Sequence, residues 1–186
     1  MDFFRDQRSK ILLSGSGRAI PSYYGTTPPT ANLGKVDAKG YEIELHVKKM
    51  VGNVNLWTDL NMTHAINVIK ERDDAALLPD YQKLVGKEIG QTYTYVSAGY
   101  YNNWDQLYGS AIQQQQDDYK LPGNYYLVDF NGDGIIDNLD NIPYGYSTWP
   151  HNTYNATIGL DWKGFSMFLQ FYGANNVTRW TPFGSL

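Results

Sequence analysis

Residues 153–172, TYNATIGLDWKGFSMFLQFY, decide the fold of this chain. Apolar and polar side chains alternate along residues 153–162, and the alternation resumes along residues 165–172 after Lys163-Gly164. A period of two residues is expected for a β-strand with one apolar and one polar face. Two such runs around a tight turn predict a pair of neighbouring antiparallel strands.

The same pattern occurs earlier, along residues 41–48 and 54–62, which flank a tight turn at 49–53. The aromatic content of 15% favours strands, and the 18 glycines supply turns and bulges. The best helix candidate is short, at residues 73–78 before Pro79. We therefore predict an all-β fold of antiparallel up-and-down strands.

The connections between these strands are uneven in length. The turns at 49–53 and 163–164 are short, whereas residues 14–31 and 68–151 form long loops. Short turns on one side and long loops on the other are typical of a transmembrane β-barrel with long extracellular loops. A polar face rich in Asn, Thr, Gln, Ser and Gly suits a barrel lumen, and its lumen candidates are Asn55, Asp59, Asn61, Thr157, Asp161 and Gln170.

Four segments are predicted from this pattern. Residues 1–67 are barrel strands with one outer loop and one tight periplasmic turn, and residues 68–151 are a long extracellular excursion. Residues 152–177 are a barrel hairpin, which residues 178–186 follow. The alternative is a soluble secreted β-domain that binds calcium and carbohydrate, in which the apolar faces meet in a closed core.

Residues 129–140, DFNGDGIIDNLD, place oxygen-bearing groups at loop positions 1, 3, 5, 7, 9 and 12, with glycine at position 6. This is the spacing with which a 12-residue loop wraps calcium. The alternative is an Asn/Asp/Gly turn whose side chains cap their own backbone. The predicted ligands of a structural calcium ion are Asp129, Asn131, Asp133, the Ile135 carbonyl, Asp137 and Asp140.

Composition excludes several classes of function. The chain has no cysteine, and its net charge of −4 provides no electrostatic basis for nucleic-acid binding. No run of about 18 apolar residues predicts a membrane-spanning helix, and residues 1–3 lack the features of a signal peptide. His46, His64 and His151 lack metal-ligand spacing, and no nucleophile motif is present, so we expect no enzyme.

Several motifs occur in an order that resembles a known family. Residues 32–45 resemble an N-x-G-x-x-x-N-K-G-x-E-x-x-L strand, although Ala38 replaces the Asn before Lys39. The other carrying segments are residues 21–25, 86–95, 122–137, 142–145 and 162–167. Together they resemble the C-terminal barrel region of the SusC/RagA-type TonB-dependent outer-membrane importers, over about residues 1–176.

The resemblance implies a location in the outer membrane of a Gram-negative bacterium, in contact with lipid. It implies uptake of an oligosaccharide or a peptide, with a SusD-like surface lipoprotein as lid and with TonB as the energy source. Such importers are several times longer than this chain, so we expect a fragment that supplies barrel wall and outer loops and in which residues 178–186 are a truncated end.

An aromatic-rich stretch lies within the predicted excursion. Sugar rings stack on aromatic side chains, and lid proteins dock on aromatic surfaces. The alternative is that these rings form the loop's own small core. The candidates for substrate or lid contact are Tyr93, Tyr95, Tyr100, Tyr101, Trp104 and Tyr108.

Overall fold

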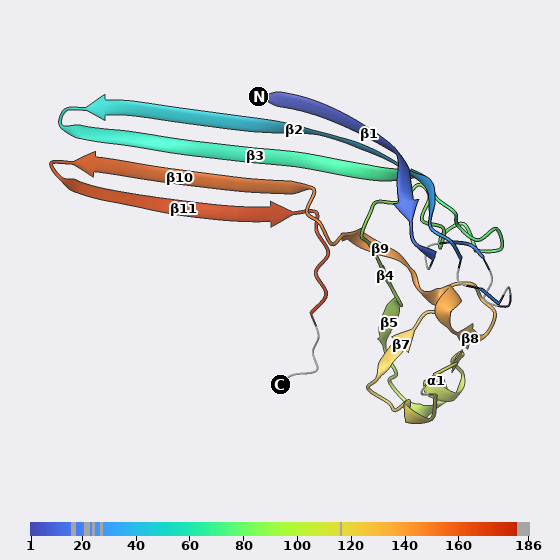
Figure 1. Cartoon of the computed structure of the whole chain (residues 1–186). Helices are drawn as coiled ribbons and strands as arrows, with labels where there is room; N and C mark the ends of the chain where they lie inside the picture. The colour runs from blue at the N-terminus through green and yellow to red at the C-terminus, as the bar shows by residue number, and fades with distance from the viewer. Residues whose placement is uncertain (16–17, 21–22, 24, 27, 116, 182–186) are drawn as a thin grey trace.

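The computed structural model describes residues 1–186 except 16–17, 21–22, 24, 27, 116 and 182–186. Its main element is a five-stranded sheet (Figure 1). The strands pair in the order β1 (Asp2–Leu13), β2 (Ala31–Val51), β3 (Val54–Glu71), β10 (Asn152–Trp162) and β11 (Phe165–Asn175). Every pair is antiparallel. The predicted all-β, up-and-down fold is confirmed.

The register of the sheet places the apolar residues of four strands on one face. Leu45 lies opposite Leu60, Leu60 opposite Ala156, and Ala156 opposite Phe171. Residues directly opposite in antiparallel strands point to the same side, so such rows run across the sheet. The neighbouring rows on this face are Ile43–Met62–Tyr154, Val47–Thr58–Ile158–Leu169 and Leu56–Leu160–Met167.

This apolar face is not covered by other described parts of the chain. Leu45, Ile158 and Leu169 are 50%, 53% and 55% exposed. In Figure 1 the sheet projects away from the loops at one end. The buried apolar residues among the described positions are Ile69, Tyr101, Leu107 and Ile136, of which Ile69 alone belongs to the sheet. The closed core that a soluble β-domain requires is not found in the described residues.

The two tight turns have the backbone conformation that two-residue hairpins need. Lys163 and Gly164 both have positive φ, at 46° and 87°, as in a type I′ turn. Gly52 has φ 61° and connects β2 to β3 through Asn53. The β2–β3 turn is therefore narrower than residues 49–53, because pairing continues to Val51 opposite Val54.

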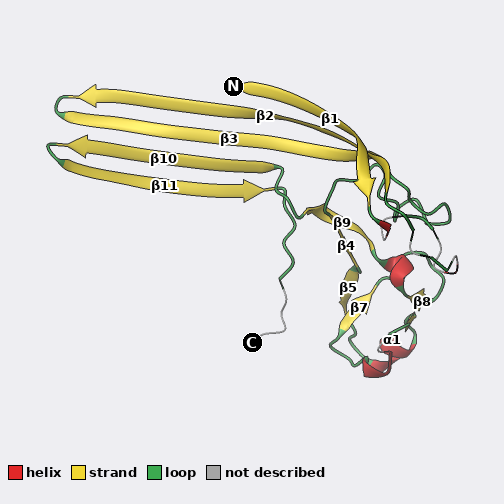
Figure 2. Ribbon diagram, in the orientation of Figure 1, coloured by secondary structure: helices red, strands yellow, loops and turns green. Residues whose placement is uncertain are grey.

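The loops at one end of the sheet contain only short elements (Figure 2). They pair as β4–β9 and β5–β7, both antiparallel, and β6–β8, which is parallel. These elements are β4 (Gln91–Thr94), β5 (Ser97–Tyr100), α1 (Trp104–Tyr108), β6 (Ile112–Gln113), β7 (Tyr125–Leu127), β8 (Ile135–Ile136), β9 (Ile142–Ser147) and the 3₁₀ turns Asp117–Tyr119 and Asn138–Asp140. Across the described residues, no helix is long and apolar enough to cross a membrane.

The helix predicted at residues 73–78 does not form. The Asp73 carboxylate accepts hydrogen bonds from Arg18 and the Ala19 N–H, and the Asp74 carboxylate accepts from the N–H groups of Leu84 and Val85. These bonds to residues elsewhere in the chain hold Asp73 and Asp74 in a non-helical conformation. A single turn remains, in which the Leu78 N–H donates to the Ala75 carbonyl. The helix that does form, α1, is capped by Asn103, whose side chain accepts from the Gln106 N–H.

The observed strand ends differ from the bounds of the predicted segments. β3 continues to Glu71 rather than ending near residue 67, and β11 ends at Asn175 rather than 177. Part of the residue 21–25 motif and the end of the 178–186 segment lie outside the described residues.

Gly159 gives a test of the sheet register. The Trp57 ring lies against Gly159, so that a Cβ added there would overlap it. We expect Gly159→Ala to lower the free energy of unfolding by about 1–3 kcal/mol, the cost typical of overpacking. Urea unfolding in detergent micelles measures this, with Thr157→Ala on the same strand face as the control. Equal midpoints for wild type and Gly159→Ala would contradict the register.

Candidate functional site

The excursion between β3 and β10 joins the sheet at a root formed by residues 86–90, 147–151 and 176–178. Beyond His64, β3 has no β10 partner, and the entering chain takes that place: Ile69 N–H donates to the Lys87 carbonyl and Gly86 N–H to the Ile69 carbonyl. The Asn67 side chain accepts from the Ile89 N–H at 2.8 Å. Residues 86–89 thus supply hydrogen-bond partners to part of β3 beyond the end of β10.

Buried polar contacts connect the entering and leaving chains at this root. The Ser147 hydroxyl, which is 1% exposed, donates to the Ile89 carbonyl at 2.8 Å. Nε2 of His151 lies 2.7 Å from a carboxylate oxygen of Glu88. The Thr148 N–H donates to the Gly90 carbonyl, and a Cβ at Gly90 would crowd both Ser147 and Thr148. Backbone and side-chain bonds thus close the excursion at its base.

Loop 129–140 is held by its own side chains. The Asp129 carboxylate accepts from the N–H groups of Gly132 and Gly134, each at 2.7 Å. Asp140, which is 1% exposed, accepts from the N–H groups of Phe130 at 2.7 Å and Asp137 at 2.8 Å. Further bonds of this kind run from the N–H groups of Asn131, Asp133, Ile135 and Leu139 to side-chain oxygens within the loop.

The donor chemistry of this loop suits calcium, but its geometry differs from a preformed cage. Four carboxylates, one carboxamide and the Ile135 carbonyl are hard oxygen donors. Each of the four carboxylates is already bonded to backbone N–H groups. Within the described part of the chain, no three His, Cys, Asp or Glu side chains gather into a group that could hold a metal. The loop is therefore folded by self-capping, as the Asn/Asp/Gly alternative expects.

The loop packs against residues 79–83. The Tyr81 hydroxyl donates to the Leu139 carbonyl at 2.7 Å, and its ring meets Phe130 edge-on at 4.9 Å. The Gln82 side chain donates to the Asn138 carbonyl. Burial, together with the carboxylates of Asp140 and Asp137, raises the pKa of the Tyr81 phenol, which therefore remains a hydrogen-bond donor at neutral pH. None of these contacts with residues 79–83 could be anticipated from the loop's spacing alone.

The six aromatic candidates divide into different environments. Tyr101 is 2% exposed, and its hydroxyl donates to Ser110, so it is a core residue that cannot meet a substrate or lid. Tyr93 is half-buried, and desolvation, with Asp74 nearby, raises its pKa. Tyr95 donates to Asn138. Among the exposed rings, Tyr100 stacks on Tyr125 and Trp104 stacks on Tyr108.

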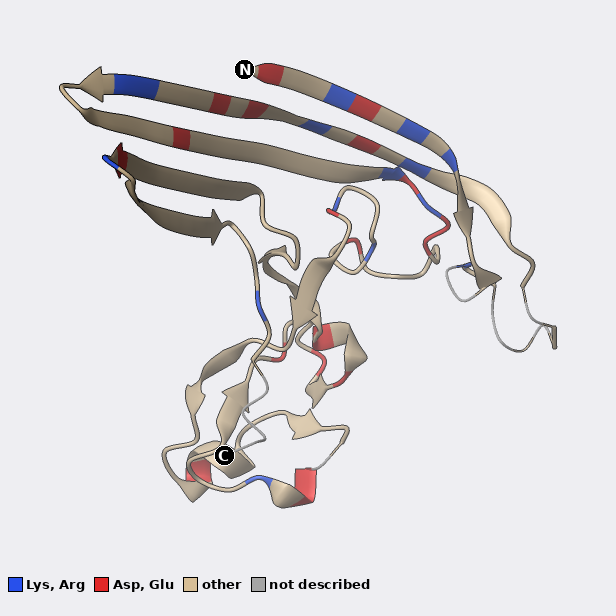
Figure 3. Cartoon of the chain, turned by 60° about the vertical axis from the view of Figure 1, so that its left-hand side comes forward, with Lys and Arg blue, Asp and Glu red and all other residues tan. Residues whose placement is uncertain are grey.

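The polar face of the sheet brings together the predicted lumen residues. Asn55 donates to Asp161 at 2.8 Å, and His46 is paired with Asp59. Asn61 lies opposite Asn155, whose side chain accepts from Gln170. Charged side chains concentrate on β1 and β2, whereas β11 carries none (Figure 3). His64 bonds Asn152 and stacks on Tyr41.

Comparisons with known proteins point to one class. No family model matches the chain. It is 26% identical over 172 residues to a protein named TonB-dependent receptor P3 from Formosa agariphila, with 83% of this chain and 16% of that protein covered. The chain thus spans about a sixth of that relative's length.

Solved structures share the fold. The RagAB peptide importer in its closed-closed state matches 94% of this chain and 19% of the solved chain, with a TM-score of 0.63 and 16% identity. A second structure of the RagAB peptide transporter matches 91% of this chain and 18% of the solved chain, with a TM-score of 0.56 and 14% identity. The chain is therefore similar in sequence to a TonB-dependent receptor, and its antiparallel sheet shares the fold of the solved RagAB structures.

Proposed function

We propose that this chain forms barrel wall and outer loops of a TonB-dependent importer in the outer membrane of a Gram-negative bacterium. The observation that carries the proposal is the pair of unlike faces on one uncovered sheet. The apolar rows face lipid, and the polar face, with Asn55, Asp59 and Gln170, lines a water-filled lumen. We propose no enzymatic role.

The height of the apolar rows supports a membrane location. On β2 they run from Ile43 to Val51, with Lys49 on the same face opposite Leu56, and on β10 they run from Tyr154 to Trp162. Nine residues rise about 26 Å along a strand and about 20 Å at the usual barrel tilt of about 40°. With the next row, Tyr41–His64–Asn152–Asn175, at its border, this height is close to the apolar band of about 25 Å found on outer-membrane barrels. Beyond Tyr41, Arg5 of β1 lies opposite Lys39 of β2 on this face, and we place the end of the apolar band there.

The substrate and partners follow from the relatives rather than from this chain. The solved relatives are named as a peptide importer and a peptide transporter. For this chain we propose uptake of an oligosaccharide or a peptide, with a SusD-like lipoprotein as lid. TonB would act through parts of the receptor outside this stretch. Residues 68–151 are proposed to be extracellular, with the ring pairs Tyr100–Tyr125 and Trp104–Tyr108 available for contact.

Two adjacent residues of β11 test which face meets lipid. Leu169 lies in the middle of the apolar rows, and Gln170 lies on the opposite face. In the full-length receptor, Leu169→Arg should cost about 2–4 kcal/mol in the membrane and strongly lower the assembled amount, whereas Gln170→Arg should be tolerated. Outer-membrane fractionation and heat-shift electrophoresis measure both variants. If Gln170→Arg is the damaging change, the assignment of the faces is wrong.

We further propose that loop 129–140 binds calcium weakly as a structural ion. The oxygen donor set supports this, with Asp129, Asn131, Asp133, the Ile135 carbonyl, Asp137 and Asp140 as ligands. An ion would have to share these oxygens with the backbone donors that already bond them. The affinity should therefore fall in the weak extracellular range, about 10⁻⁴–10⁻³ M.

Calorimetry with calcium chloride tests the ion. The chain should give a saturable heat in the millimolar range, and Asp133→Ala should remove it, because Asp133 supplies a charged ligand at position 5. The control is Asp118→Ala, an exposed acid outside the loop. Unchanged binding by Asp133→Ala, or no heat with the wild-type chain, would remove the calcium proposal.

The self-capped fold of the loop gives a prediction that does not depend on the ion. Asp140→Ala leaves the part-buried N–H groups of Phe130 and Asp137 without their carboxylate partner, each at a cost of about 1 kcal/mol. Amide hydrogen exchange in residues 129–140 should accelerate strongly in chelator-treated protein. Asp118→Ala should leave it unchanged. Slow exchange retained in Asp140→Ala would show that this carboxylate does not hold the loop.

A further inference from the structure

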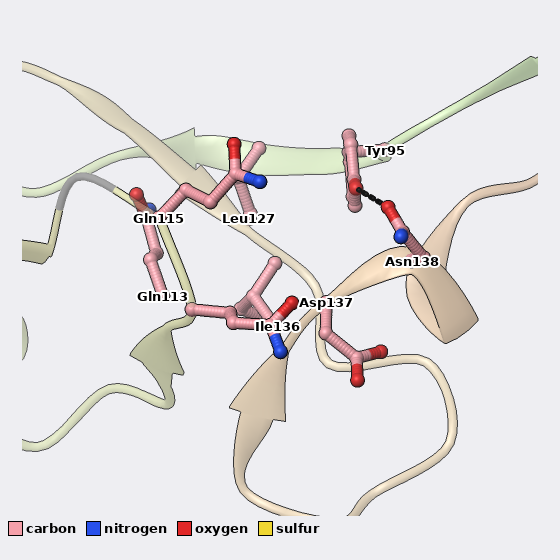
Figure 4. A pocket seen from close by; sticks show the side chains of 8 residues that line it. Tyr95, Gln113, Gln115, Leu127, Ile136, Asp137 and Asn138 are labelled. Atoms are coloured by element: carbon pink, nitrogen blue, oxygen red, sulfur yellow. Dashed lines mark hydrogen bonds between the residues drawn. The ribbon is translucent and has the colours of Figure 1, made fainter.

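A pocket of about 250 Å³ lies between loop 129–140 and the short strand β6. Figure 4 shows Tyr95, Asn138, Gln113 and Gln115 around it. Its full lining is Tyr95, Gln113, Gln114, Gln115, Leu127, Ile136, Asp137 and Asn138. Three glutamines in a row thus meet the end of the loop predicted for calcium. Neither the calcium prediction nor the exposed ring pairs explain this arrangement.

The backbone around the pocket is already ordered. β6 pairs with β8, and the Gln114 N–H donates to the Ile136 carbonyl at 3.0 Å. The Gln113 N–H donates to the Asp117 carboxylate at 2.8 Å, and Asp117 is itself paired with Lys120 at 2.6 Å. The hydrogen bond from Lys120 lowers the pKa of Asp117, so this anchor stays charged at neutral pH. The pocket wall is therefore largely preformed.

The side chains of this wall, by contrast, have unused hydrogen-bonding groups. In the described structure, no hydrogen bond engages the carboxamides of Gln113, Gln114 or Gln115, although Gln113 is half-buried. Asn138 uses its carbonyl oxygen to accept from Tyr95, which leaves its amide donor open. Asp137 bonds the Leu139 N–H through one oxygen. Several donors and acceptors thus converge on a small space.

The chemistry of this lining selects a class of ligand. No Lys or Arg belongs to the lining residues, so an anion finds no cationic partner and meets the Asp137 carboxylate. A carboxamide offers a donor and an acceptor side by side, which suits neighbouring hydroxyl groups. The Tyr95 ring, Leu127 and Ile136 supply apolar surface for a C–H face. A peptide added as a strand is disfavoured here, because the N–H groups of Gln113 and Gln114 are already bonded.

We propose that this pocket, here called the carboxamide pocket, binds one ring of a neutral oligosaccharide. Its volume of about 250 Å³ is below the ~300 Å³ at which pockets for drug-sized ligands begin, which suits a single ring of a longer chain. The proposal rests on the proposed role in nutrient uptake. It assigns sugar recognition to the carboxamide pocket rather than to the exposed ring pairs.

The experiment compares three variants of the full chain with the wild type in detergent, with saturation-transfer NMR and calorimetry as readouts. The probes are neutral tetrasaccharides of glucose, galactose, mannose and xylose, with tetraalanine as the peptide probe. At least one tetrasaccharide should bind saturably. The double variant Gln113→Ala/Gln115→Ala should weaken it about tenfold or more, because two hydrogen-bonding groups are lost. Tyr144→Ala, an exposed ring outside the pocket and outside the ring pairs, is the matched control and should leave affinity unchanged. Tyr108→Ala removes one ring of the exposed pairs and tests the alternative that these pairs recognise the sugar.

Three results would overturn the carboxamide pocket. The first is no binding of any tetrasaccharide up to about 10 mM, which would detect even weak single-ring binding. The second is a loss of affinity in Tyr108→Ala but not in the glutamine variant, which would place recognition on the ring pairs. The third is tighter binding of tetraalanine than of any sugar. Far-UV circular dichroism of each variant checks that it folds.

Failure of the pocket and failure of the proposed function are separable. The Leu169→Arg and Gln170→Arg pair reports on membrane assembly without reference to any ligand. Normal assembly with no sugar binding would remove only the pocket.

Discussion

The backbone hydrogen-bond ladder through β2, β3, β10 and β11 is the interaction on which the rest of this structure depends. Side chains alternate between faces, so the register alone decides that Leu45 and Ile158 share one side while His46 and Asp59 share the other. A slip of one residue would exchange the two faces along a whole strand. Among the described residues, no core covers the apolar face of the sheet, so packing against a core cannot correct such a slip. An apolar face that stays exposed is a liability in water and a requirement in lipid.

The excursion is organised separately from the wall. It enters and leaves through the root, where Ser147, Glu88 and His151 make contacts that are mostly buried. Beyond the root it builds small cores of its own around Tyr101, Leu107 and Ile136. Arg18 connects the first loop to the base of the excursion through Asp73, and the hydrogen bond from its guanidinium lowers the pKa of that carboxyl. Residues far apart in the chain are thus held at one end of the sheet without a large core.

Loop 129–140 has its own hydrogen bonds, packs against residues 79–83 and lines the carboxamide pocket. Its carboxylates fold the loop by accepting backbone N–H groups, so an ion would strengthen an existing shape rather than create it. In the folded loop, the Leu139 carbonyl accepts a hydrogen bond from the Tyr81 hydroxyl. Ile136 and Asn138 of the same loop line the carboxamide pocket. Loop 129–140 therefore lies between residues 79–83 and the carboxamide pocket, and this packing is independent of the proposed ion.

The sequence by itself determined the strands, their alternation, both tight turns and the order of motifs that resembles the receptor family, because each depends on local spacing or on backbone preferences of single residues such as Gly52 and Gly164. It also delimited loop 129–140, since glycine and carboxylate positions define a curled turn whichever partner the oxygens find. Only the tertiary structure decided that Asp73 and Asp74 bond distant groups instead of starting a helix, that Tyr101 is buried while Tyr100 is exposed, and that Asp140 faces the backbone. The physical reason is that a carboxylate bonds, and a ring packs against, whichever donor or surface the fold brings close. These partners lie about 10 to 60 residues away along the chain, so the local sequence does not indicate which of them will be close.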